Sequence, residues 1–409
     1  MGAPLKRTNA RHLVDEHLRE LERLADTAGA RVVGQLTQAL DRPNPSTYVG
    51  KGKVEELKQM IAEKEATVLI FDDELSPAQG KNLEEELGKR VIDRAELILD
   101  IFAVRARSAE ARMQVELAQL EYSLPRLTRM WTHLEKFRGG IGVRGPGETQ
   151  LESDRRLVGH RVKLLKERLA DVQRSREIQR QGRKEQFKVA LVGYTNAGKS
   201  SILKGLSHAA DVFIEDRLFA TLDPLTREVD LGDKQKCLLT DTVGFIRKLP
   251  HHLVASFRAT LEETREADLL LHVIDTSHPT WEEQRMVVDE LLGEIGVGET
   301  PVVHVFNKID LLAPEVVEAM RARMANLLPD ALFVSARREP ELEPLRELLR
   351  SKLASLHPVT DVRVPAGNGK LLAEIHREAE VISSRLDEET GEMVLAVRAD
   401  AASRSKWGV

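Results

Sequence analysis

The sequence predicts a multidomain α/β protein in which one domain is a doubly wound parallel sheet. The chain has 409 residues, more than the roughly 250–300 at which a single hydrophobic core stops growing. Residues 187–357 alternate strongly apolar strands with helical segments, which is typical of a parallel sheet covered on both faces. The expected strands of this domain read KVALVG, KCLLTD, LLLHVID, PVVHVFN and ALFVSA.

Residues 1–107 predict a smaller α/β domain, because helical and strand-like patterns alternate there as well. A helical stripe comes first and is formed by Leu13, Leu18, Leu21 and Leu24. The expected strands read RVVGQLTQAL, ATVLIF and RVID, and the expected helices between them read VEELKQMIAEK and LSPAQGKNLEEELG.

Residues 108–186 predict two antiparallel helices, because apolar residues recur at steps of four and three as in a coiled-coil seam. The first helix contributes Met113, Leu117, Leu120, Leu124, Leu127, Trp131 and Leu134, and the second contributes Leu151, Val158, Val162, Leu165, Leu169 and Val172. The segment RGGIGVRGPGETQ separates them, and its five glycines predict a loop rather than a helix.

Basic residues border this glycine-rich loop, and two readings of them stay open. They are Arg126, Arg129, Lys136, Arg138, Arg144, Arg155, Arg156 and Arg161. The loop can be a flexible hinge beside solvated helix faces. It can equally be an RNA-contacting tip, because glycine lets the backbone approach phosphates and guanidinium groups pair with them and stack on bases.

Composition limits the classes of protein that fit. The net charge of −5 gives no global basic field, so contact with nucleic acid would need a local patch. Cys237 is the only cysteine, which excludes an intrachain disulfide and a multi-cysteine metal site. The start of the chain lacks a signal peptide and no run approaches roughly 18 apolar residues, so we expect a soluble cytoplasmic protein. Residues 358–409 predict a small α/β module with strands near VRVP, VISSRL and EMVLAVRA around the helix LLAEIHREAE.

The segment GYTNAGKS matches the phosphate-loop pattern GxxxxGK[ST], and it lies between an apolar strand and a helix. Loop amides and the helix N-terminus bind phosphates in such a loop, while Lys199 reaches the outer phosphates and Ser200 ligates Mg²⁺. The nucleotide contacts expected here are Gly193, Tyr194, Thr195, Asn196, Ala197, Gly198, Lys199, Ser200 and Ser201.

A second element, Asp241-Thr242-Val243-Gly244, ends the next apolar strand. We expect Asp241 to join the Mg²⁺ shell and the backbone amide of Gly244 to sense the γ-phosphate. Phe245 follows where many such switches carry a Gln that orients the attacking water. The chain therefore lacks that catalytic group.

A third element predicts guanine specificity. Asp310 can accept hydrogen bonds from the imino and exocyclic amino groups of guanine, a donor pair that adenine lacks, and unpaired buried groups make such discrimination large. The Lys308 stem can cover one face of the base. The residues expected around the base are Asn307, Lys308, Ile309 and Asp310 after one strand, and Ser335, Ala336 and Arg337 after the next.

Between the phosphate loop and Asp241, a switch segment needs a Thr whose hydroxyl binds Mg²⁺ and whose N–H meets the γ-phosphate. We expect Thr221, with Thr226 as the lesser candidate; either can instead be an ordinary strand residue. The contacts predicted in this segment are Phe219, Ala220, Thr221, Leu222 and Asp223. The expected Mg²⁺ ligands are thus Ser200, Thr221 and Asp241, and the expected catalytic residues are Asn196, Lys199, Thr221 and Gly244.

On these motifs the chain resembles HflX-type GTPases. The resemblance rests on GYTNAGKSS, FATLDPLTR, DTVGF, NKID and VSARR, together with PSTYVGKGKVEEL and LTRMWTHLEKFRGGIGVRGPGETQLESDRR. It implies a monomeric GTP/GDP-binding switch that hydrolyses GTP, associates with the large ribosomal subunit and its RNA, and dissociates stalled or idle ribosomes, especially under stress. Two alternatives stay open: a GTPase that assists large-subunit assembly, and an RNA-remodelling protein with additional ATP use in the amino-terminal domain.

The resemblance also bears on the missing Gln. In the wider group, an Asn at the position of Asn196 can hold a potassium ion that replaces an arginine finger, although Asn196 can also simply shape its loop. Arg247 and Lys248 follow Phe245 and can contact a partner or be solvated. Gly50-Lys51-Gly52-Lys53 can begin a helix or belong to a second nucleotide site.

Overall fold

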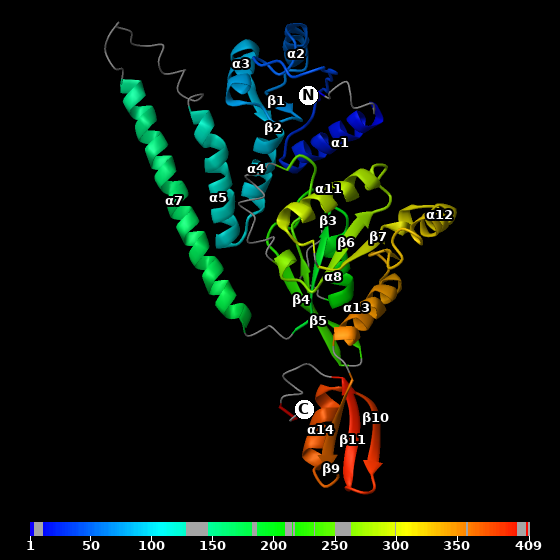
Figure 1. The fold of residues 1–409 in the computed structure, drawn as a ribbon. Helices are drawn as coiled ribbons and strands as arrows, with labels where there is room; N and C mark the ends of the chain where they lie inside the picture. Colours follow the sequence, from blue (N-terminus) through cyan, green and yellow to red (C-terminus); the bar gives the residue numbers. More distant parts are fainter. Residues whose placement is uncertain are drawn as a thin grey trace. The chain divides into compact units, whose positions relative to one another are not determined.

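The computed structural model describes residues 1–3, 11–127, 146–181, 186–208, 215, 217–232, 234–249, 263–298, 300–356, 359–398 and 406–407. The chain forms two compact units (Figure 1). Unit 1 comprises Met1–Ser175, Asp216–Asp223 and Ile246–Ala259, and unit 2 comprises Arg176–Glu215, Pro224–Phe245 and Thr260–Val409. Two short pieces of the nucleotide-binding part of the sequence therefore group with the amino-terminal unit.

Unit 1 opens with a small α/β layer. Its elements are α1 (Arg11–Thr27), α2 (Lys51–Glu63), β1 (Val68–Phe71), α3 (Pro77–Leu87), β2 (Arg90–Asp93) and α4 (Arg94–Arg105). The two strands pair in parallel. Helix α3 begins with a capping box, since Ser76 and Gln79 exchange hydrogen bonds, which satisfies amides that have no partner inside the helix. Val54, Leu57, Phe71 and Leu83 are buried between the helices and strands and form the core.

The strand predicted over RVVGQLTQAL is wrong. Residues 31–40 join none of the described sheets and form isolated bridges instead, one of them between Gly2 and Thr37. Most side chains of this segment are exposed or half-buried. Its alternating pattern therefore reflects partial burial and not a place in the sheet, because the β1–β2 pair offers it no continuous edge.

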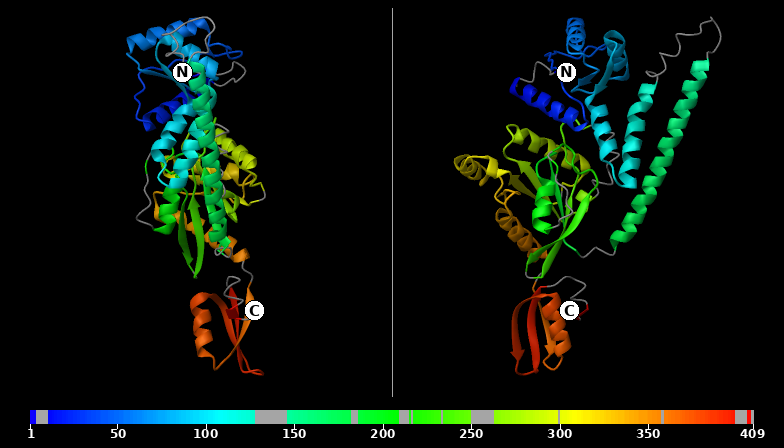
Figure 2. Two further views of the ribbon diagram at one scale, coloured as in Figure 1. Left: turned by 90° about the vertical axis from the view of Figure 1, so that its left-hand side faces the viewer. Right: turned by 180° about the vertical axis from the view of Figure 1, so that it is seen from behind.

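The second part of unit 1 is a helical pair, α5 (Ala109–Ser123) with the 3₁₀ turn η1 (Leu124–Arg126), and α7 (Pro146–Gln181). The two helices run side by side in Figures 1 and 2. Arg161 bonds Glu116 at 2.6 Å and Lys166 bonds Glu121 at 2.8 Å, while Leu165 is fully buried. Of the residues predicted for the seam, Leu117 and Leu165 are buried, and the prediction is confirmed at these two positions.

The glycine-rich loop ends earlier than predicted. Pro146 and Gly147 form the first turn of α7, because proline fits the first turn, where its missing N–H is not needed. The remaining loop residues, with Trp131, Leu134, Arg129, Lys136, Arg138 and Arg144, lie outside the described residues.

Unit 2 is built on a six-stranded sheet with the order β4-β5-β3-β6-β7-β8. The strands are β3 (Lys188–Gly193), β4 (Leu225–Gly232), β5 (Gln235–Asp241), β6 (Leu269–Asp275), β7 (Val302–Asn307) and β8 (Leu332–Phe333). All pairs are parallel except β4–β5, which is an antiparallel hairpin. The doubly wound prediction is confirmed, with one antiparallel edge strand added.

Helices cover both faces of this sheet. On one face, α8 (Lys199–Ser207) and α13 (Glu343–Leu356) contribute Ile202, Leu203, Leu345 and Leu349 to a core shared with β3, β5 and β6. On the other face, α11 (Trp281–Ile295) and α12 (Pro314–Met324) pack with Ile274, Phe306 and Phe333. The short turns η3 (Ile309–Leu311) and η4 (Glu339–Leu342) follow β7 and β8. Parallel strands so covered end at one edge of the sheet, where ligands bind in such folds.

The predicted carboxy-terminal module is confirmed. Strands β9 (Thr360–Pro365), β10 (Glu380–Asp387) and β11 (Glu392–Arg398) form an antiparallel sheet of order β10-β11-β9, covered by α14 (Gly369–Glu378) (Figure 2). Its core contains Val362, Val364, Ile375 and Leu395. Among the described residues, no helix is both long and apolar enough to cross a membrane.

Cys237 lies in β5 inside the unit 2 core and is 1% exposed. Burial raises the pKa of its thiol to about 12, because an apolar environment disfavours the thiolate. At pH 8 only about one molecule in ten thousand would then carry the reactive form.

We therefore expect Cys237 to resist Ellman's reagent at pH 8 in the folded protein. One thiol per chain should react after unfolding in guanidinium, and the absorbance of the released thiolate measures it. Reaction of the folded protein at the rate of a free thiol would show that β5 does not bury this residue.

Candidate nucleotide-binding site

The phosphate loop connects β3 to α8 and folds as the sequence predicts. Gly198 adopts φ 99° at the start of α8, a conformation that favours glycine. A Cβ at this position would lie 2.2 Å from Nδ2 of Asn307. No other residue type fits here, because the loop passes against the end of β7.

Lys199 is buried and reaches back over the loop. Its Nζ donates to the carbonyl oxygens of Gly193 and Tyr194 at 3.2 and 3.0 Å. Burial lowers its pKa to about 8, against the raising effect of Asp241. A triphosphate placed in this loop would supply the negative charge that a buried ammonium needs.

Ser200 and Asp241 are brought together as predicted. The Ser200 hydroxyl donates to Oδ2 of Asp241 at 2.6 Å, so a hydroxyl and a carboxylate converge beside the loop. Both are hard oxygen ligands of the kind that Mg²⁺ prefers. The donor set therefore fits Mg²⁺.

The DTVGF segment is joined to the phosphate loop by its main chain. The Phe245 amide donates to Gly193 at 3.0 Å, and the Thr195 amide donates to Phe245 at 2.7 Å. A Cβ on Gly244 would lie 2.6 Å from Cα of Thr195, which explains the glycine. The Phe245 side chain is 1% exposed, so it belongs to the core and cannot orient water.

Asn307 links the guanine-recognition segment to the phosphate loop. Its side-chain amide donates to the Ala197 carbonyl at 2.9 Å, and its side-chain oxygen accepts from the Ala336 amide at 3.0 Å. It is 1% exposed. One buried side chain thus holds the loops that follow β3, β7 and β8 in register.

The residues expected to contact the base are also positioned. Ser335 donates to Oδ1 of Asp310 at 2.7 Å, which orients that carboxylate. Lys308 adopts φ 65° and its Nζ bonds Asp275 at 2.7 Å. Asp275 was not predicted from the sequence; the signal available was its position at the end of LLLHVID, beside Asn307 in the adjacent strand.

Unit 2 thus brings together the predicted contacts of the phosphate loop, of Asp241–Gly244 and of the two base segments. The predicted switch residues 219–223 group instead with unit 1. The ring of Phe219 packs edge-on against Phe102 at 4.6 Å, and Asp223 accepts from the amides of Arg107 and Ser108 at 3.1 and 3.2 Å, at the start of α5. Contact of Thr221 with Mg²⁺ stays a prediction. The lesser candidate, Thr226, lies in β4 and bonds Thr240 at 2.9 Å, so it is the ordinary strand residue.

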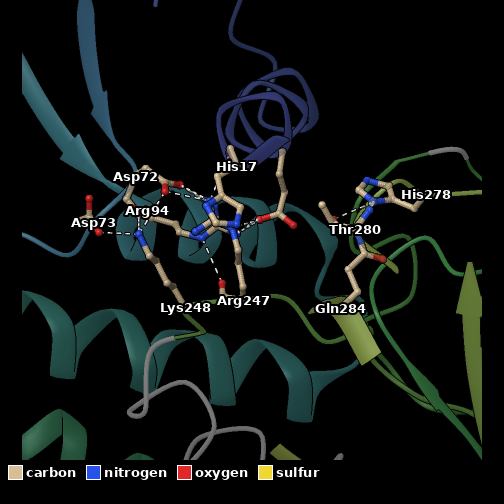
Figure 3. A network of polar contacts seen from close by, with 10 residues as sticks. His17, Asp72, Asp73, Arg94, Arg247, Lys248, His278, Thr280 and Gln284 are labelled. Atoms are coloured by element: carbon tan, nitrogen blue, oxygen red, sulfur yellow. Dashed lines mark hydrogen bonds and ion pairs between the residues drawn. The ribbon is translucent and has the colours of Figure 1, made fainter. Parts of the chain in front are cut away.

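Arg247 and Lys248, which follow the DTVGF segment, are paired within unit 1. Arg247 is 7% exposed and bonds both carboxylate oxygens of Asp72 at 2.9 and 2.8 Å. Arg94 bonds the same carboxylate at 2.9 Å, and Lys248 reaches it at 3.2 Å (Figure 3). The solvated interpretation of Arg247 is therefore wrong. Asp72 is 175 residues away from Arg247 in the sequence, so no local sequence pattern predicts this ion pair.

The Gly50–Lys53 segment begins α2. Gly50 is the N-cap residue and the Lys53 amide donates to its carbonyl at 2.9 Å, while Lys53 pairs with Glu56. These contacts fit the helix-start interpretation, and a second nucleotide site there stays a prediction.

Three family models match successive parts of the chain: "GTP-binding GTPase N-terminal" over residues 15–103, "GTP-binding GTPase Middle Region" over 105–183 and "50S ribosome-binding GTPase" over 188–308. The "GTPase HflX" of Caldanaerobacter subterraneus is 46% identical over 376 residues, covering 91% of this chain and 86% of that protein. The chain belongs to the HflX GTPase family. The Escherichia coli "GTPase HflX" is 44% identical over 388 residues, 94% of this chain and 89% of its own. Among solved structures, a complex of SsGBP with GDP is 27% identical with a TM-score of 0.48, covering 87% of this chain and 99% of that one.

The Asp72 cluster gives the first unit of this HflX-family chain a defined pH dependence. Burial alone would raise the pKa of Asp72, but the charges of Arg94, Arg247 and Lys248 outweigh it and lower the pKa to about 2. Because this pKa is lower than the ordinary value of 3.8, ionisation of the carboxylate stabilises the folded state by about 2 kcal/mol relative to the unfolded chain. This stabilisation is complete above pH 5 and is lost as the pH falls through 3.8 towards 2, because the unfolded chain binds the proton first.

We expect Asp72→Asn to lower the free energy of unfolding by about 2–3 kcal/mol at pH 6, because two buried guanidinium groups lose an anion. At pH 3 the difference in the free energy of unfolding between the variant and the wild type should be about half as large as at pH 6. Urea unfolding at both pH values measures it. Asp73→Asn is the matched control, since Asp73 bonds only the half-exposed Lys248 within this cluster, and it should cost less than about 1 kcal/mol. Equal costs for the two variants would mean that the cluster does not stabilise the unit.

Proposed function

We propose that this chain is a GTP-hydrolysing switch that binds the large ribosomal subunit and dissociates stalled or idle ribosomes, acting as a monomer in the cytoplasm. The observation that carries the proposal is the assembled pocket, in which Asn307 holds the phosphate loop against the base loops. The matching "50S ribosome-binding GTPase" model supports the ribosomal partner.

The pocket residues have distinct tasks in this proposal. Lys199 donates to the outer phosphates of GTP, and the Gly244 amide meets the γ-phosphate. The Asp310 carboxylate, held by Ser335, accepts from the guanine edge. Ser200, Asp241 and Thr221 would hold Mg²⁺, which neutralises charge between the β- and γ-phosphates. The remaining predicted contacts, from Phe219 to Asp223, would exchange their present contacts for contacts with the nucleotide when the triphosphate is bound.

Intrinsic hydrolysis is expected to be slow. Phe245, whose side chain is buried, occupies the position of the Gln that orients water in many such switches. An arginine finger, where one is present, typically accelerates hydrolysis roughly 10³–10⁵-fold, which corresponds to about 4–7 kcal/mol of activation free energy. A potassium ion held by Asn196 would offset charge that develops during phosphoryl transfer. Ribosome docking is the second expected source of acceleration.

Asn196 also has a conformational role, since its φ of 61° lies in the left-handed region that glycine and asparagine tolerate best. Asn196→Gly keeps that backbone freedom and removes the amide. We expect hydrolysis by the wild type to be at least about tenfold faster in potassium than in sodium, and Asn196→Gly to fall to the sodium rate in both salts. Phosphate release measures it. A glycine variant that keeps the potassium stimulation would show that Asn196 only shapes the loop.

Sedimentation of intact ribosomes with this protein and a non-hydrolysable GTP analogue tests the main proposal. The expected result is separation into subunits, with the protein on the large one. Lys199→Ala should lose this effect because the outer phosphates lose their buried cation, whereas Lys204→Ala, an exposed residue on the same helix, should keep it. Intact ribosomes, with protein bound only to immature particles, would favour the assembly alternative; RNA remodelling that survives Lys199→Ala would favour the ATP-dependent one.

A further inference from the structure

A histidine pair lies inside the unit 2 sheet, where His272 is the register partner of Val192, one residue before the phosphate loop. His272 in β6 and His304 in β7 are register partners in adjacent parallel strands, and their ring centroids are 5.2 Å apart. His272 is 1% exposed. A polar ring so deep in an apolar strand normally has a bonded partner.

Helix α11 brings a carboxylate to the same place. Oδ1 of Asp289 lies 3.3 Å from Nδ1 of His272, a polar contact whose geometry is not that of a regular hydrogen bond. The other carboxylate oxygen, Oδ2, faces Arg285 at 3.8 Å. Asp289 therefore turns one oxygen towards the histidines and the other towards the half-buried guanidinium of Arg285.

We infer that His272, Asp289 and His304 form a binding site for one divalent transition-metal ion, with Zn²⁺ the best match. One ligand atom from each residue lies within 4.8 Å of the other two. Ligands at about 2.0–2.1 Å from a tetrahedral ion are about 3.3 Å apart, which is the separation of His272 and Asp289. Two imidazoles and a carboxylate suit Zn²⁺ and leave one position for water.

The protonation states agree with this geometry. Burial lowers the pKa of His272, and burial with the neighbouring His272 lowers the pKa of His304 to about 4. Both rings are neutral at pH 7, so each offers a nitrogen lone pair without first losing a proton. Two positive charges oppose a cation here: Arg285, which faces Asp289 at 3.8 Å, and Lys199, which also lowers the pKa of His272.

The place of the site in the fold indicates its role. An ion held here would join β6, β7 and α11, three residues before Asp275 and Asn307, which anchor the base-recognition loop. An ion in this position would cross-link elements that the sheet already brings together, and its fourth position would stay open to water.

Co²⁺ titration followed by the visible bands of low-coordinate Co²⁺, with Zn²⁺ competition, tests the inference. The full chain is loaded with GDP and kept in excess Mg²⁺, which does not favour imidazole ligands. We expect one high-affinity Co²⁺ per chain that Zn²⁺ displaces. Asp289→Asn and His304→Gln should each weaken it at least about 100-fold, since even a supporting residue contributes 10–100-fold. His160→Gln, on the exposed face of α7, is the control and should bind like the wild type.

Asp289→Asn is the decisive variant because its side chain is 42% exposed, so the fold should tolerate the change; unchanged GDP binding verifies this. If Asp289→Asn binds Co²⁺ as tightly as the wild type, or the wild type binds none tightly, the inference is wrong. Neither result affects the proposed GTPase function, whose own test is ribosome sedimentation.

Discussion

The two hydrogen bonds of the Asn307 side chain hold the nucleotide site together. Its amide group spans from the Ala197 carbonyl to the Ala336 amide. The first contact is buried and the second is partly buried, and leaving a buried polar group unpaired costs about 1–3 kcal/mol. The same contact explains why position 198 is a glycine, because a Cβ there would overlap the Asn307 side chain. One residue at the end of β7 thus joins the loops predicted to bind the phosphates and the base.

A second constraint acts on the segment after Gly244. Phe245 is bonded to the phosphate loop through its main chain, and Arg247, two residues later, ends in a buried cluster with Asp72 and Glu20. Only the buried Ile246 separates these two attachments. Phe245 thus belongs to unit 2 and Arg247 to unit 1. Phe219 and Asp223, which the sequence predicts as switch residues, likewise contact α4 and α5 of unit 1.

The parts that the sequence predicted are those whose determinants are contiguous. The phosphate loop, Asp241–Gly244 and the NKID segment each combine a strand end with a fixed spacing, so sequence order alone located them. The Asp72–Arg247 pair could not be found in this way, because a carboxylate after one strand has no local sign that selects its distant partner. The strand predicted over residues 31–40 is wrong for the opposite reason. Apolar and polar residues do alternate there, but strand pairing also depends on an available sheet edge, which is a tertiary property. His272 and His304 did leave a signal, one histidine at the centre of each apolar strand, but only the register of β6 and β7 shows that they meet.

Phe245 connects these points to catalysis. A residue that follows the γ-phosphate sensor can either face the pocket and assist water or face the core and stabilise the sheet, and burial shows that Phe245 does the second. Its backbone is already used in bonds to Gly193 and Thr195, so turning the side chain outward would cost both packing and register. A group that orients water must then come from another position. In the function proposed above, a cation in the phosphate loop or the docked partner would supply this acceleration.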